Sequence, residues 1–135
     1  MVEDARAGNA GTGGGIANAN FGIPPSGGSG VLTMTGSTIS GNSASGFGGG
    51  LGNAPDSTAT ITGSSLSGNS TAGFGGGVVN QGELAMTGSQ VLDNTAAAGG
   101  GIANQGGTVT LTGTRVAGNT PDNCEPPGTI AGCTG

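Results

Sequence analysis

The sequence has 135 residues, of which 34 are glycine, and it contains no Trp, Tyr or His. Its formal net charge is −5, with Arg6 and Arg115 as the only basic side chains, which argues against binding to nucleic acid and to anionic membrane surfaces. No apolar run approaches the length needed to span a membrane, and only Phe21, Phe47 and Phe74 could supply aromatic rings to a core, which argues against an ordinary globular interior.

The chain begins in the middle of a pattern that recurs later. In the stretch ARAGNAG, within residues 1–12, Asn9 takes the position that Asn42 takes in the following unit. We therefore predict that residues 1–12 form a partial first coil without a cap, which would leave strand edges open to self-association through this N-terminal coil.

Residues 13–120 contain four sequence units, each with three glycines, a Thr-rich block ending in Thr-Gly and a block ending in Asn. The first unit is longer because residues 19–30 form an insertion rich in turn-forming residues. A repeat of this length is typical of a solenoid. The Thr-Gly threonines, Thr35, Thr62, Thr87 and Thr112, follow one another at spacings of 27, 25 and 25 residues.

Each unit contains three short blocks in which apolar and polar residues alternate, with Gly or Asn between the blocks. Alternation with a period of two is typical of β-strands, and Gly and Asn tolerate the positive φ of a sharp corner. We therefore predict an all-β fold, a three-faced β-solenoid of about four coils of 24–27 residues. The predicted inward stacks are Ile16, Leu51, Val78 and Ile102; Met34, Ile61, Met86 and Leu111; and Ile39, Leu66, Val91 and Val116.

Two other folds compete with the solenoid as interpretations of this composition. A helical repeat is rejected because each Gly would oppose a helix by about 1 kcal/mol. A disordered, low-complexity chain remains the alternative, although aligned aliphatic columns in four units argue against it.

Two registers of asparagine recur with the same period. A column of identical amides can form hydrogen bonds from coil to coil, so we predict ladder or turn roles rather than ligand contacts. The two registers are Asn18, Asn53, Asn80 and Asn104, and Asn42, Asn69, Asn94 and Asn119.

Threonines of the second block are predicted to face solvent, in columns about 4.8 Å apart along the solenoid. Thr is also common on the exposed side of ordinary strands, and Ala85 interrupts the array. The candidate surface array consists of Thr33, Thr35, Thr60, Thr62, Thr87, Thr110 and Thr112.

The pairing of GGGI, GGGL and GGGV with the later ISGN, LSGN, VLDN and VAGN resembles the repeats of polymorphic outer membrane proteins and of the wider group of secreted bacterial right-handed parallel β-helix proteins. The resemblance covers nearly the whole chain and implies a right-handed coil and a role in adhesion or surface display. Because the outer membrane family usually carries Phe where this chain has Ile39, Leu66, Val91 and Val116, the wider group is the better match.

The titratable side chains form no pattern typical of catalysis or of metal binding. The seven acids lie at unrelated positions of the repeat, and His and Lys are both absent from the sequence. Asp93 and Arg115 could lie near one another on successive coils, which a surface ion pair explains as well as a catalytic role does. We therefore predict that the protein is not an enzyme, has no catalytic residues and uses no metal or cofactor.

Residues 121–135 leave the repeat, and their prolines are expected to end strand pairing. This segment contains Cys124 and Cys133, which would form a disulfide over the last coil in an oxidising compartment; a reactive pair in the cytoplasm is the alternative.

Three classes of function remain open from the sequence. The first is a non-catalytic, secreted or cell-surface structural or adhesive module. The second is a solenoid that binds a glycan, another cell-surface ligand or ice through the threonines or near Phe21 and Ile23. The third is a scaffold that presents a C-terminal peptide for modification or recognition. The first residues resemble no secretion signal, so a native start at Met1 would instead indicate a cytoplasmic protein.

Overall fold

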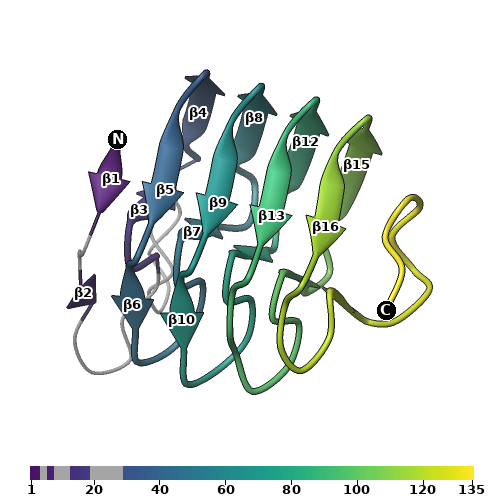
Figure 1. Ribbon diagram of the computed structural model, residues 1–135. Helices are drawn as coiled ribbons and strands as arrows, with labels where there is room; N and C mark the ends of the chain where they lie inside the picture. Colours follow the sequence, from purple (N-terminus) through teal and green to yellow (C-terminus); the bar gives the residue numbers. More distant parts are fainter. Residues whose placement is uncertain (4–5, 8–12, 19–28) are drawn as a thin grey trace.

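The computed structural model describes residues 1–3, 6–7, 13–18 and 29–135, and every regular element in these ranges is a β-strand (Figure 1). Asn9, Phe21, Ile23 and most of the insertion 19–30 lie outside the described residues. Within the described residues, no helix is long and apolar enough to cross a membrane.

Most of the strands form three parallel sheets, here called walls 1, 2 and 3, because each block of a unit pairs with the same block of the next unit. Wall 1 contains β3 (Ile16–Asn18), β7 (Leu51–Asn53), β11 (Val78–Asn80), β14 (Ile102–Asn104) and β17 (Cys124–Glu125). Wall 2 contains β4 (Val31–Thr35), β8 (Thr58–Thr62), β12 (Glu83–Thr87) and β15 (Thr108–Thr112). Wall 3 contains β1 (Val2–Glu3), β5 (Thr38–Ser40), β9 (Ser65–Ser67), β13 (Gln90–Leu92) and β16 (Arg115–Ala117).

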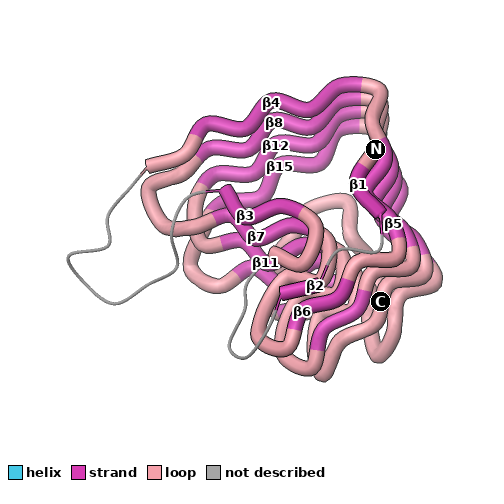
Figure 2. The backbone as a smooth tube through the Cα atoms, turned by 90° about the vertical axis from the view of Figure 1, so that its left-hand side faces the viewer, coloured by secondary structure: helices cyan, strands magenta, loops and turns pink. Residues whose placement is uncertain are grey.

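The coil is right-handed, as the resemblance implied. In Figure 2, which looks from the N-terminal end, the chain runs clockwise from β4 through β5 to β6 (Ser43–Ala44) while it moves away from the viewer. The predicted three-faced parallel β-helix of about four coils is therefore confirmed.

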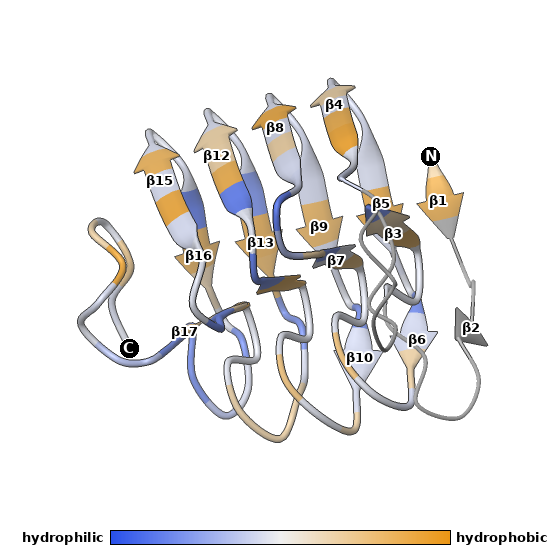
Figure 3. Cartoon of the chain, turned by 180° about the vertical axis from the view of Figure 1, so that it is seen from behind, coloured by the Kyte–Doolittle hydropathy of each residue, from blue (hydrophilic) through white to orange (hydrophobic). Residues whose placement is uncertain are grey.

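The three predicted inward stacks are confirmed by the strand register. Ile16, Leu51, Val78 and Ile102 are successive partners on wall 1; Met34, Ile61, Met86 and Leu111 on wall 2; and Ile39, Leu66, Val91 and Val116 on wall 3. Wall 2 adds a fourth inward stack that the sequence reasoning missed, made of Leu32, Ala59, Leu84 and Val109. Figure 3 shows the resulting apolar bands recurring at the same level of β4, β8, β12 and β15.

The middle glycine of each triple glycine is needed because neighbouring coils pack closely there. A Cβ atom on Gly49 would lie 2.5 Å from the carbonyl oxygen of Gly76 and 2.6 Å from the carbonyl carbon of Ser70. Both are backbone atoms, which cannot rotate away as a side chain can. These glycines therefore set how closely the coils stack.

A short fourth sheet lies between wall 3 and wall 1, where the sequence predicted only a corner. It consists of β2 (Arg6–Ala7), β6 and β10 (Ser70–Thr71), and isolated bridges continue it from Ser70 to Thr95 and from Thr95 to Thr120. Its small Ser, Thr and Ala residues carry no clear apolar alternation, which is why the pattern gave no sign of a strand.

Phe47 and Phe74 do not enter the core. Their side chains remain 38% and 37% exposed, and their rings stack on each other outside the coils with centroids 5.9 Å apart. Because the interior is filled by aliphatic stacks, the aromatic pair contributes a contact between two coils on the outside instead.

Residues 121–135 cap the C-terminal end of the solenoid. Cys124 and Cys133 form the predicted disulfide, and Ile130 and Cys133 are buried in the hydrophobic core cluster. The prolines do not end strand pairing as expected, because β17 still pairs with β14 on wall 1. The tail departs from the coil only after Glu125.

The cap predicts a measurable contribution of the disulfide to stability. We expect Cys124→Ser combined with Cys133→Ser to lower the free energy of unfolding by about 2–3 kcal/mol, because a loop of this size loses about that much chain entropy when it is closed. Urea unfolding followed by far-UV circular dichroism would measure the change. Reducing the wild-type protein should lower its stability by the same amount, and a reduced protein as stable as the oxidised one would contradict the prediction.

Candidate functional site

Wall 2 presents three outward columns, because alternate residues of its five-residue strands point away from the core. From β4 to β15 the columns are Val31, Thr58, Glu83 and Thr108; Thr33, Thr60, Ala85 and Thr110; and Thr35, Thr62, Thr87 and Thr112. Nine of these twelve positions are threonine, and all seven threonines of the predicted array are exposed. We call these twelve residues the threonine face.

The hydroxyl groups at the next corner behave differently from those of the threonine face. There, Ser37, Ser64, Ser89 and Thr114 form a column that the sequence reasoning missed. The Ser64 hydroxyl accepts a hydrogen bond from the backbone N–H of Ser37 at 3.1 Å and donates one to the carbonyl of Thr62 at 2.9 Å. The corner hydroxyls are therefore engaged within the fold, whereas those of the threonine face point to solvent.

The threonine face is flat and nearly neutral. In Figure 2 the four strands of wall 2 lie one behind another with little lateral offset. Glu83 is the one charged residue among its twelve positions. The arrangement can therefore offer hydroxyl and methyl groups at regular intervals, with little electrostatic attraction for charged ligands.

The first asparagine register forms a buried ladder behind the corner between walls 1 and 2. The Asn18 amide donates to the Asn53 side-chain oxygen at 2.8 Å, Asn53 donates to Asn80 at 2.8 Å, and Asn80 donates to Asn104 at 2.9 Å. Asn104 ends the ladder by donating to the carbonyl of Gly107 at 2.9 Å.

The second asparagine register forms another ladder, at the corner between wall 3 and the short fourth sheet. The Nδ2 atoms of Asn42, Asn69 and Asn94 donate to the next side-chain oxygen at 3.1, 3.0 and 2.9 Å. Asn119 then donates to Asn123 at 3.0 Å, and the Asn123 amide donates to the carbonyl of Thr134 within the cap. Asn123 is thus the last member of this ladder, although it does not follow the 25–27-residue spacing of the other members.

Both registers carry structural hydrogen bonds, as predicted, and most of their members are buried. An amide that already donates and accepts between two coils offers little to an external ligand. The ladders instead fix the coils in register, which holds the spacing of the threonine face constant.

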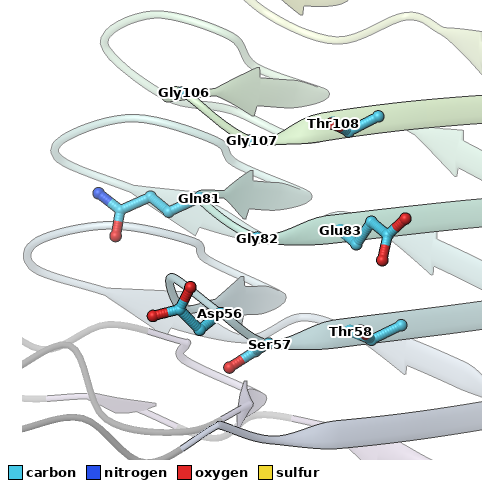
Figure 4. A pocket seen from close by; sticks show the side chains of 9 residues that line it. All are labelled: Asp56, Ser57, Thr58, Gln81, Gly82, Glu83, Gly106, Gly107 and Thr108. Carbon is cyan, nitrogen blue, oxygen red and sulfur yellow. The ribbon is translucent and has the colours of Figure 1, made fainter.

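A shallow depression of about 310 Å³ lies beside the threonine face, where the corner between walls 1 and 2 differs in length from coil to coil (Figure 4). Asp56 and Gln81 line one side, and Thr58, Glu83 and Thr108 of the threonine face line the other. Figure 4 shows these side chains on successive coils, with no basic group among the labelled residues. The depression is suited to hydrogen bonding with a polar, uncharged ligand.

Asp93 and Arg115 do not line this depression. Asp93 and Arg115 form no ion pair in the described part of the chain, because Arg115 is the register partner of Gln90, three residues before Asp93. The Asp93 carboxylate lies against Gly118 instead. No group of three or more potential metal ligands is present in residues 1–3, 6–7, 13–18 and 29–135.

Comparison with known proteins gave no assignment. No family model matches the chain, and no curated protein or solved structure was found to be similar to it. The threonine face, the adjoining depression and the cap are therefore the features of the molecule that bear on its function.

Proposed function

We propose that this chain is a non-catalytic, secreted or cell-surface module of the bacterial β-helix type that acts in adhesion through the threonine face. The observation that carries the proposal is the register of nine outward threonines on one flat wall. Because the asparagine ladders and corner hydroxyls are engaged internally, the threonine face is, among the described residues, the largest regular set of side chains left to meet a partner.

The disulfide supports an extracellular location. Bonds of this kind persist in oxidising compartments and are rare in the cytosol. The repeated GGGI and IxxN-like motifs, which resemble those of secreted β-helix proteins, agree with this location. The mass of the protein from its natural source should increase by two hydrogen atoms on reduction.

Glycan binding is the second candidate, and the polar depression beside Glu83 favours it. Its carboxylates and lack of basic side chains suit a neutral glycan better than an acidic one. Presentation of a C-terminal peptide receives less support, because Ile130 and Cys133 are packed into the core cluster.

An adhesion assay with matched charge substitutions tests the proposal. Beads coated with wild-type protein should be retained under flow on intact cells and on glycan-coated glass. Thr62→Glu combined with Thr87→Glu should lower retention by about tenfold, since charge is introduced at the centre of the face, and tenfold corresponds to about 1.4 kcal/mol.

Ser65→Glu combined with Gln90→Glu is the matched control, because these residues are register partners on wall 3 and add the same charge to the same two coils. This variant should be retained like the wild type. Equal retention of all three proteins, or loss with both variants, would contradict a role for the threonine face.

A further inference from the structure

We propose that the threonine face binds the surface of ice. The inference rests on the proposed function, in that it takes the threonine face to be the working surface of the module, and it names the partner. It follows from the spacing, the chemistry and the rigidity of this face together.

The spacing of the face favours a periodic solid as its partner. Neighbouring strands lie about 4.8 Å apart, and outward residues along a strand recur about every 6.7 Å. The column Thr35, Thr62, Thr87 and Thr112 is unbroken across all four coils. A small ligand touches only a few such residues, whereas a crystal whose own surface repeats at similar distances engages every column at once.

The chemistry of the face matches a lattice of water molecules. Each threonine hydroxyl both donates and accepts hydrogen bonds, as each water molecule in ice does. The adjacent methyl group is apolar and favours ordered water over bulk water beside it. A neutral lattice offers no counter-charge, and the face carries one charged residue, Glu83, at its edge next to the corner.

The fold holds this array in place without help from a ligand. Inward partners of the face, Ile61, Leu84 and Met86, are at most 1% exposed, so they anchor the central strands firmly. The first asparagine ladder lies on one side of wall 2 and the Ser37, Ser64, Ser89 and Thr114 column on the other, and each ties one coil to the next. Little conformational entropy remains to be lost when the face meets a solid surface.

The inference is tested by thermal hysteresis, ice shaping and partition into a slowly growing ice front, all with the full chain. Wild-type protein should shape ice crystals and partition into ice. Thr62→Tyr combined with Thr87→Tyr should abolish both effects, because two bulky rings lift the face off a flat surface. Ala85→Thr, which completes the middle column, should raise the hysteresis.

Ser65→Tyr combined with Gln90→Tyr, on wall 3, is the control and should leave ice activity unchanged. Far-UV circular dichroism establishes that all variants are folded. Absence of ice shaping and of partition in the wild type at about 1 mM would overturn the inference, as would equal loss in the wall 3 control.

A pull-down with microcrystalline cellulose separates this inference from the proposed function. One outcome is that the wild type binds cellulose but not ice and that Thr62→Tyr combined with Thr87→Tyr abolishes the binding to cellulose. This outcome would overturn ice as the partner and keep the threonine face as an adhesive surface. Binding to neither solid, together with failure of the bead assay, would overturn both proposals.

Discussion

Gly76→Ala is expected to lower the free energy of unfolding by about 3 kcal/mol or more, the upper range for forcing extra atoms into a packed interior. The added Cβ would lie 2.6 Å from the carbonyl oxygen of Thr95 and would also meet the carbonyl oxygen of Gly100. Relief would require two coils to move apart, because both oxygens belong to the backbone. Urea unfolding followed by far-UV circular dichroism suits the measurement, since the chain has no Trp or Tyr.

Gly88→Ala provides the matched control for this steric effect. Gly88 has a φ of +55°, but a Cβ there would have no heavy atom within 4 Å. Its replacement by Ala should lower the free energy of unfolding by about 1–2 kcal/mol, which is the penalty for a non-glycine residue in the left-handed conformation. If the two variants lost equal stability, close approach of the coils would not be the reason for the triple glycine.

Asn94→Ala is expected to lower the free energy of unfolding by about 3–5 kcal/mol, because several buried polar groups lose their partners at once. The Asn94 side-chain oxygen accepts from the backbone and side-chain nitrogens of Asn69 at 2.9 and 3.0 Å. Its Nδ2 donates to the carbonyl of Leu66 and to Asn119 at 3.0 and 2.9 Å. The same urea titration measures the loss.

Two further variants make this prediction specific to the ladder. Asn104→Ala, at the half-buried end of the other ladder, should cost only about 1 kcal/mol. Asn94→Asp keeps the side-chain oxygen that accepts hydrogen bonds but replaces the donating Nδ2 with a second oxygen. That oxygen would face the Leu66 carbonyl oxygen and the Asn119 side-chain oxygen. Burial would raise the pKa of the new carboxyl, so stability should recover as pH falls and protonation restores one donor. A loss in Asn94→Asp that does not depend on pH would contradict the assigned hydrogen bonds.

The walls and ladders could be predicted because each follows from a local pattern that recurs with the coil. Leu66 and Val91, for example, are partners on wall 3, at matching places in units of 25 residues. Once strands stack in register, any residue type that recurs at this spacing must form a column. The same logic predicted that Thr62 and Thr87 are neighbours on the outside.

Other features could not be predicted because they depend on contacts outside the period. Asn123 follows Asn119 by only four residues, and it becomes a rung because the cap folds back toward it. The sequence around Phe47 and Phe74 does not say on which side of the corner a ring lies. The pairing of β17 was missed because the nearby prolines suggested an end to the sheet, whereas Cys124 and Glu125 lie between Pro121 and Pro126 and pair with β14.

The unequal corner beside the depression has a consequence for engineering. After the first coil, the connection between walls 1 and 2 contains four residues (54–57), two (81–82) or three (105–107). The connection between walls 2 and 3 contains two in every coil (36–37, 63–64, 88–89 and 113–114). The corner between walls 1 and 2 therefore accommodates connections of different length, and both asparagine ladders continue from coil to coil. A foreign peptide inserted between Gln81 and Gly82 would be displayed beside the threonine face. In tandem copies of the unit, the inserted peptides would be displayed at regular intervals along the solenoid.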